Sequence, residues 1–359
     1  MSKLSLKATA IGSLPHANPE EASNLIWETF SDIPFWPQLA QVNNMEDMIV
    51  QYSQNVPGIF IKPEEQIFGF NPENDEFYSD LEEFYMDFDE IIEEGNLEKL
   101  DKYGISSPYT SSIENFYQNI KLNKPSFAKG HITGPFTWGT SICDNDKKCI
   151  FYDETYRDIV TKALSLKALW QIRKMKEAYE DITPIIFIDE PTMSQFGTSA
   201  FITVQESDIV DSLNAITGVI NSNGALSAVH CCGKTDWNMI LKTGIKILNF
   251  DAYSFAKSFT VYSKQIKEFL TNGGYIAWGI VPTLDTEALE ASTKESLMQK
   301  LEEGISSLES KGLDRKLVLE QSIITPSCGA GCLPVKLAEK AMKLTSEIAN
   351  DLKNKYEVL

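Results

Sequence analysis

The sequence predicts an α/β fold, specifically a (β/α)₈ TIM barrel with extra helices inserted in the N-terminal third. About eight apolar, β-type runs alternate along the chain with longer amphipathic stretches, the order expected when helices connect the strands of a parallel sheet. A length of 359 residues suits one large barrel. No low-complexity linker divides the chain, so we expect a single domain over residues 1–359. A doubly wound open sheet is the alternative arrangement.

The first two β-type runs cover residues 8–13 and 34–39, and a helical segment opened by NPEEA lies between them. The segment of about 40–125 that follows is too long for a simple strand–helix unit. We therefore expect it to be a helical insertion or a flap that covers one end of the barrel.

Six further runs complete the predicted barrel. They cover residues 126–135, 184–191, 226–232, 245–253, 275–282 and 317–329. Helical segments follow them, the clearest near 155–180, at 205–222 and in the last stretch, KLAEKAMKLTSEIANDLKNKY. In a barrel, the C-terminal ends of the strands converge on one active site. Polar side chains fall at those ends, namely Ser13, His131, Thr133, Asp189, Glu190, His230, Cys232, Asp251 and Cys328.

The composition limits the partners of the protein. The formal net charge is −19, which argues against nucleic acid and anionic membranes, since both require a basic surface. No signal peptide is recognisable, and no apolar run is long enough to span a bilayer. Six cysteines are too few for a disulfide scaffold of this length, so we expect a reducing, cytoplasmic setting. The acidic stretch 73–101 is interpreted as a solvated helical face, with a docking surface for a partner protein as the alternative.

The segment LSAVHCCGK suggests a metal site. His230 and Cys232 are two residues apart, so on an extended strand both side chains point to the same face while Cys231 points to the other. Cys328, at the end of the eighth run, offers a third ligand of the kind zinc prefers, and Asp251 could be a weak fourth ligand. Buried free cysteines, a vicinal disulfide and a clip formed by Cys328 with the nearby cysteine of CGAGC are the alternatives.

Seven motifs occur in an order that resembles one family. They are TAIGSLPH (9–16), NMEDMIVQYS (44–53), KPSFAKGHITGPFTW (124–138), IIFIDEPTM (185–193), VHCCGKTDW (229–237), ILNFDAYS (247–254) and ITPSCGAG (324–331). In this order the chain resembles the uroporphyrinogen decarboxylase / cobalamin-independent methionine synthase superfamily of zinc methyltransferases, and most closely the catalytic C-terminal half of the synthase. The H-C-C-G variant is also similar to the H-x-C-G motif of methylcorrinoid:thiol methyltransferases.

The resemblance implies roles for individual residues. It implies that His230, Cys232 and Cys328 bind zinc, and that Asp251 stands where the family has a glutamate ligand. It also implies an acceptor pocket formed by Ile11, Gly12, Ser13 and Asp189. An acid that the synthases place just before the N-D-M segment has no counterpart in QVNNMEDM.

Three further residues are candidates for the site. His16 and His131 could line its mouth and steer a proton or a substrate carboxylate, with a structural hydrogen-bonded histidine as the alternative for each. Glu190 could act in catalysis or support the metal, with a buried ion pair as its alternative.

The resemblance implies a chemistry in which zinc holds a small thiol, such as homocysteine, as a thiolate for methyl transfer. The folate-dependent synthases carry a second half and bind a polyanionic tail, whereas this chain is strongly acidic. A methylated corrinoid, free or on a carrier protein, is therefore the expected donor. A decarboxylase-like lyase and a non-catalytic corrinoid- or metal-binding protein are the alternatives.

Overall fold

The computed structural model describes residues 4–62 and 67–356. The N-terminal third contains α1 (Pro19–Thr29), β1 (Ile59–Lys62), β2 (Ile67–Phe70), α2 (Phe77–Ile92) and α3 (Ile113–Asn123). The middle of the chain contains β3 (Phe127–Thr133), α4 (Pro135–Ser141), α5 (Glu154–Ala178), β4 (Thr183–Asp189), α6 (Glu206–Ser222), β5 (Leu226–Cys231) and α7 (Trp237–Leu241). The last third contains β6 (Ile247–Phe250), α8 (Ala252–Phe259), α9 (Ser263–Thr271), β7 (Tyr275–Val281), α10 (Thr286–Ala291), α11 (Lys294–Ser310), α12 (Arg315–Glu320), β8 (Ser322–Pro326) and α13 (Val335–Tyr356).

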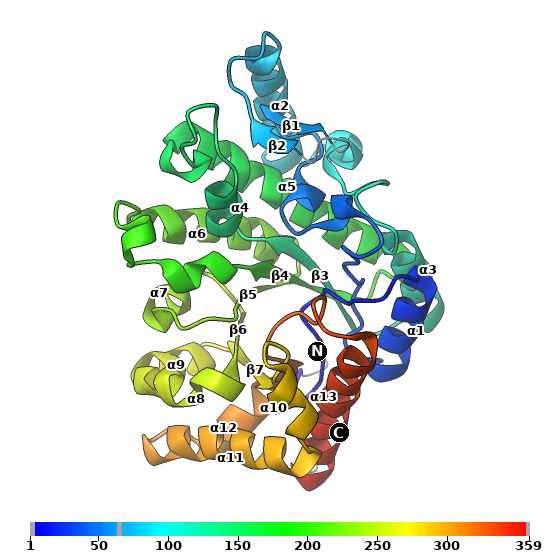
Figure 1. Ribbon diagram of the computed structural model, residues 1–359, viewed down its shortest axis with the longest axis vertical. Helices are drawn as coiled ribbons and strands as arrows, with labels where there is room; N and C mark the ends of the chain where they lie inside the picture. The colour runs from blue at the N-terminus through cyan, green and yellow to red at the C-terminus, as the bar shows by residue number, and fades with distance from the viewer. Residues whose placement is uncertain (1–3, 63–66, 357–359) are drawn as a thin grey trace.

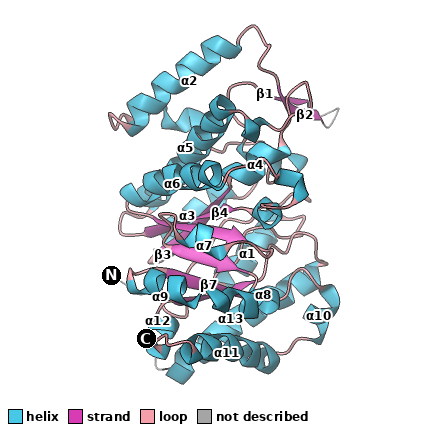
Figure 2. Cartoon of the chain, turned by 90° about the vertical axis from the view of Figure 1, so that its left-hand side faces the viewer, coloured by secondary structure: helices cyan, strands magenta, loops and turns pink. Residues whose placement is uncertain are grey.

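Six parallel strands form the main sheet, a half-barrel in the sequential order β3-β4-β5-β6-β7-β8. Helices lie around the outside of this sheet (Figures 1 and 2). The strands are buried on both faces: β3 is buried along its whole length, and β4 is buried and apolar along most of its length. The α/β class and the six later strands are therefore confirmed.

The first two predicted strands are not regular strands, so the full eight-stranded barrel stays a prediction. Residues 8–13 and 34–39 make only isolated parallel bridges, Ala8 with Ile324 of β8 and Phe35 with Lys129 of β3. A third bridge joins Ser13 to Gln38. Two prolines interrupt the second run, and proline has no N–H to donate to a ladder.

The predicted run 317–329 also needs a correction, because its first part is helical. Asp314 caps α12 by accepting a hydrogen bond from the Lys316 N–H, and the chain enters β8 only at Ser322. A short apolar run such as LVLE has no period that separates a helix from a strand.

The segment between the second run and β3 contains an antiparallel hairpin, β1 and β2, together with the helices α2 and α3. Figure 2 shows α2 at one end of the molecule, far from α11. The buried Lys167 of α5 holds this region by donating to the carbonyl oxygens of Gln54 at 2.9 Å and Tyr103 at 3.3 Å. The assignment of residues 1–359 to one domain stays a prediction.

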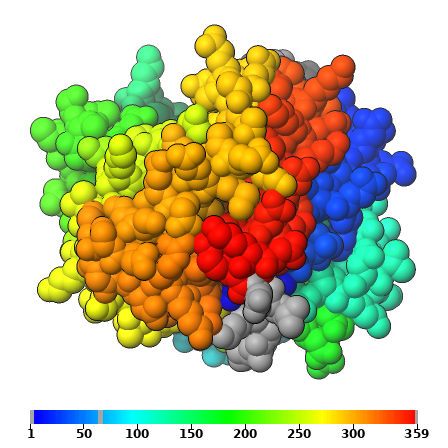
Figure 3. All heavy atoms as spheres, turned by 90° about the horizontal axis from the view of Figure 1, so that it is seen from below, coloured from blue at the N-terminus to red at the C-terminus, as the bar shows by residue number. Residues whose placement is uncertain are grey.

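The two ends of the chain pack side by side. Figure 3 shows the C-terminal residues in red between the orange residues of α11 and the blue N-terminal residues. Asp32 accepts hydrogen bonds from Lys7, at 2.9 Å, and from Lys353 of α13. Among the described helices, none is long and apolar enough to cross a membrane.

Inward-facing side chains position the site. One face of the strands encloses a small apolar cluster, separate from the larger core under the helices, whose members include Phe127, Ile185, Phe187, Ala228, Ile247, Ala277 and Ile323. Because side chains alternate along a strand, residues on the same face but closer to the C-terminal ends of the strands include His131, Asp189, His230, Asn249 and Thr325. The apolar cluster thus forms the floor of a polar layer.

Candidate metal centre

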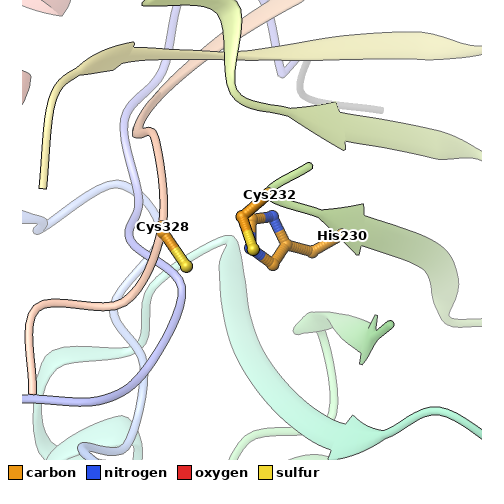
Figure 4. Close-up of side chains that lie close together, drawn as sticks. All are labelled: His230, Cys232 and Cys328. Carbon is orange, nitrogen blue, oxygen red and sulfur yellow. The ribbon is translucent and has the colours of Figure 1, made fainter. Parts of the chain in front are cut away.

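Three predicted ligands meet at the C-terminal ends of β5 and β8. One ligand atom from each of His230, Cys232 and Cys328 lies within 4.8 Å of the other two, the sole such group of three or more metal-binding side chains in the described residues. Figure 4 shows the Cys328 side chain, from the loop after β8, directed toward the two side chains from β5. The set of one nitrogen and two sulfurs is typical of a zinc site with one open position.

Strand alternation separates the two adjacent cysteines as predicted. Cys231 is fully buried within the larger core under the helices, where its thiol contacts the Gly233 carbonyl oxygen at 3.5 Å. Cys232 lies on the opposite side, beside Cys328. Thr283 holds Cys328 in place, because its hydroxyl donates to the Cys328 carbonyl oxygen at 2.9 Å and accepts from the Cys328 N–H at 3.0 Å.

Asn249 determines which ring nitrogen of His230 can bind a metal. The Asn249 amide nitrogen donates to the Ala277 carbonyl oxygen at 3.0 Å and to Thr325 Oγ1 at 2.8 Å. Its Oδ1 therefore faces His230 Nδ1 and accepts the proton there. His230 Nε2 is buried and has no hydrogen-bond partner among the described residues. A histidine that binds a metal through one ring nitrogen commonly donates a hydrogen bond from the other, as His230 does from Nδ1.

The Cys232 and Cys328 thiols contact each other, and their pKa values shift in opposite directions. The hydrogen bond from Cys328, with the contact from His230, lowers the pKa of Cys232 to about 4. The same contact with Cys232, together with burial, raises the pKa of Cys328. Burial alone would lower the pKa of His230, but Cys232 and Asp189 raise it above its usual value. The lowered pKa favours a thiolate at Cys232, the form of cysteine that binds a soft cation.

Asp251 is not part of the group of three. It is the N-cap of α8, and its Oδ1 accepts a hydrogen bond from the Ser254 N–H at 2.9 Å. Burial raises the pKa of this carboxyl group. Its role as a fourth ligand stays a prediction.

The residues predicted to bind the acceptor lie beside the group of three. Gly12 has a φ of +153°, and a Cβ there would lie 2.8 Å from the His131 ring, so only glycine lets the chain pass so close. Ser13 packs against the loop that carries Cys328, since its hydroxyl accepts from the Gly331 N–H at 3.3 Å. A Cβ on Gly329 would lie 2.1 Å from that hydroxyl.

Asp189 and His131 carry buried polar atoms that have no hydrogen-bond partner in the described chain. No hydrogen bond from the described residues reaches Asp189 Oδ1 or either ring nitrogen of His131. The His131 ring stacks on Trp36, with centroids 3.9 Å apart. Burial raises the pKa of Asp189 to about 6, against the opposing charges of His230 and Lys129. Burial, with the nearby Lys129, lowers the pKa of His131 well below its usual value, so its imidazole is neutral.

Lys129 lies beneath these groups. It is fully buried between the rings of Phe35 and Phe187, and its ammonium donates to the Ile11 carbonyl oxygen at 2.5 Å. Burial lowers its pKa to about 7, although Asp189 opposes the shift.

Glu190 is turned away from the group of three. Its carboxylate accepts from the N–H groups of Phe136 at 2.9 Å and Thr137 at 2.8 Å, and from the Thr137 hydroxyl at 2.6 Å. It thus binds the N-terminus of α4, where a carboxylate is favoured. Burial raises its pKa to about 7, against these hydrogen bonds. A catalytic role for Glu190 stays a prediction.

His16 lies within reach of α13. It is buried, its Nε2 is 3.9 Å from the Glu339 carboxylate, and its Nδ1 has no partner among the described residues. A direct role in the site stays a prediction.

Sequence reasoning missed Lys129, Asn249 and Trp36. For Lys129 and Asn249 a signal was available, because both alternate with apolar residues on a strand that carries or adjoins a predicted site residue. For Trp36 none was, because the ring reaches His131 only through the tertiary fold.

Comparison with known proteins shows distant homology to a methionine synthase. No family model matches the chain. A methionine synthase of Methanocaldococcus jannaschii is 28% identical over 232 residues, which is 62% of this chain and 64% of that protein. The aligned region thus spans less than two thirds of the relative. This homology supports the methionine synthase and uroporphyrinogen decarboxylase-like superfamily that the motifs suggest. Among solved structures, a Cellulomonas fimi endo-beta-1,4-mannanase double mutant is 13% identical with a TM-score of 0.37, over 67% of this chain and 59% of that one.

Proposed function

We propose that the protein is a cytoplasmic, zinc-dependent methyltransferase that moves a methyl group from a methylated corrinoid to a small thiol such as homocysteine. The group of His230, Cys232 and Cys328, within 4.8 Å of one another, is the observation that carries the proposal. Distant homology to a methionine synthase supports methyl transfer as the reaction class.

The donor set fits zinc. Two sulfurs and an imidazole nitrogen are its preferred ligands, and three protein ligands leave a position for substrate. His230 would bind through Nε2, which lacks any other partner in the described chain, and Cys232 would bind as the thiolate. When bound, zinc would supply a Lewis acid that keeps an acceptor thiol deprotonated at neutral pH, although a free thiol has a pKa of about 8.5.

The remaining residues would bind and orient the acceptor. Asp189, with its unpartnered Oδ1, suits an ammonium or hydroxyl group on the thiol. The neutral His131 could donate one hydrogen bond and accept another. Lys129 fixes the backbone of the Ile11–Ser13 segment from below. Such positioning would lower the entropic cost of bringing the acceptor sulfur and the methyl group together.

Metal analysis followed by a transfer assay tests the proposal. We expect one zinc ion per chain that survives desalting, and methyl transfer from methylcobalamin to at least one thiol in a panel that includes homocysteine and coenzyme M. Protein without bound zinc but with decarboxylase activity would favour the lyase alternative. Bound zinc without transfer to any thiol would favour a non-catalytic binding protein.

A further inference from the structure

A second pair of cysteines lies away from the metal group. Cys143 and Cys149 are both half-buried, and their Sγ atoms are 3.8 Å apart. They stand opposite each other in an antiparallel bridge between α4 and α5. Both are free thiols in this structure.

The loop between them holds the two thiols in register. Asp144 accepts hydrogen bonds from the N–H groups of Asp146 at 3.0 Å and Lys148 at 2.9 Å, and Lys147 has a φ of +62°. Backbone bonds flank the pair on both sides, from the Asp144 N–H to the Lys148 carbonyl oxygen and from the Ile150 N–H to that of Ile142. The cysteines are therefore a non-hydrogen-bonded pair, whose Cα atoms lie about 4.5 Å apart in such ladders. That spacing is within the range that a disulfide can span.

The loop is also attached to the N-terminal hairpin. The Phe70 N–H at the end of β2 donates to the Cys143 carbonyl oxygen at 3.3 Å, and the Asn145 amide donates to Asn71 Oδ1 at 3.2 Å. Burial and the contact with Cys143 raise the pKa of Cys149 to about 11.

We propose that Cys143 and Cys149 are a redox-active dithiol that closes to a disulfide across the loop 143–149. With a small disulfide such as oxidised glutathione as the oxidant, the thiolate of one cysteine attacks a glutathione sulfur and releases one glutathione thiolate. The second cysteine loses its proton to solvent and attacks the mixed disulfide, which releases the second glutathione. Two protein thiols are oxidised to one disulfide, and one glutathione disulfide is reduced to two thiols.

Peptide mapping of the full chain tests the pair directly. The protein is equilibrated in glutathione buffers of increasing oxidation, alkylated and digested with trypsin, which cleaves after Lys147 and Lys148, between the two cysteines. We expect a linked pair of peptides that contain Cys143 and Cys149 and separate on reduction. Because the two thiols already touch, the mixed disulfide with glutathione should not accumulate.

Two cysteine variants distinguish a specific disulfide from general oxidation. Cys143→Ser should remove the linked peptides and leave Cys149 glutathionylated, whereas Cys332→Ser, at an exposed cysteine, should leave the linkage unchanged. Mixed disulfides alone at both positions in fully oxidised buffer would overturn the proposal, as would a linkage of either cysteine to Cys232 or Cys328. Since the readout is a peptide mass, it does not depend on zinc binding or methyl transfer.

Discussion

At the scale of single residues, the side-chain amide of Asn249 determines which nitrogen of His230 can bind a metal. Asn249 is fully buried and is oriented by Ala277 and Thr325, so its Oδ1 fixes the proton on His230 Nδ1. Residues that orient a ligand in this way typically contribute 10- to 100-fold to metal affinity.

We expect Asn249→Leu to weaken zinc binding by roughly 10- to 100-fold, because the ring loses the acceptor that fixes its tautomer. Asn249→Asp keeps an oxygen opposite Nδ1 and should lose much less affinity. Competition with a chromogenic chelator measures both. A folded Leu variant with unchanged affinity would show that Asn249 does not orient the ligand.

We expect Cys232→Ser and Cys328→Ser each to abolish tight zinc binding, because a serine hydroxyl does not ionise at neutral pH to replace a thiolate. Cys231→Ser should retain zinc, because the side chain of residue 231 lies in the larger core under the helices. Zinc content after desalting is the measurement. Equal loss from all three variants would contradict the strand register at β5.

Asp189 lies beside the metal group without belonging to it. We expect Asp189→Asn to weaken acceptor binding by roughly 10- to 100-fold without loss of zinc, the range for a hydrogen bond to a charged group of about 1.5–3 kcal/mol. The pKa of Asp189 is raised to about 6, so the carboxylate is lost as the pH falls below that value. The affinity of the unsubstituted protein for the acceptor should therefore fall as the pH drops below about 6, whereas the affinity of the Asn variant should not change over that range. Metal loss from the Asn variant would instead make Asp189 a ligand.

At the scale of elements, Glu190 joins β4 to α4. Its carboxylate accepts three hydrogen bonds at the start of α4, and an amide would turn a donor toward one of them. Glu190→Gln should therefore lower the free energy of unfolding by about 1–3 kcal/mol. Zinc content should not change.

Thermal unfolding, with Glu180→Gln as an exposed control, measures this effect. If the Gln variant were as stable as the unsubstituted protein but inactive, Glu190 would act in catalysis, as the sequence suggested.

Elements predicted from the sequence fall into two groups. Strands β3 to β8 and the helices α5, α6 and α13 follow from long periodic or apolar runs. Residues 8–13 and 34–39 have the same apolar character, but Pro34 and Pro37 remove donors, and only the packed fold shows that isolated bridges replace strands there.

The candidate site divides in the same way. The two-residue spacing at β5 and the loop after β8 predicted His230, Cys232 and Cys328, which the fold brings together. The use of Asp251 as a helix cap and of Glu190 as a helix anchor depends on which backbone N–H groups lie nearby. These hydrogen bonds depend on how α8 and α4 pack, and the spacing of residues in the sequence does not show that.

At the scale of the whole molecule, acidic charge dominates. The chain has 51 acidic and 32 basic residues, and many acids are concentrated on α2 and its flanks. Two large side chains of α2, Tyr78 at 76% and Met86 at 57%, are exposed among them. The net charge of −19 therefore repels polyanions on average, and this negative field has a range of about 8 Å at physiological ionic strength.

That field bears on the methyl donor. A folate with a polyglutamate tail is a polyanion and is repelled, whereas methylcobalamin carries no such tail. We expect methyl transfer from methylcobalamin or from a methylated corrinoid protein, and none from methyltetrahydrofolate with a polyglutamate tail. The assay supplies each donor in turn to zinc-loaded protein with the same panel of thiols, at low and at raised ionic strength. If repulsion were the barrier, salt would raise any residual folate activity, because screening shortens the field. Turnover with the folate at low salt and none with any corrinoid would overturn this choice of donor, while the assignment of the zinc ligands would stand.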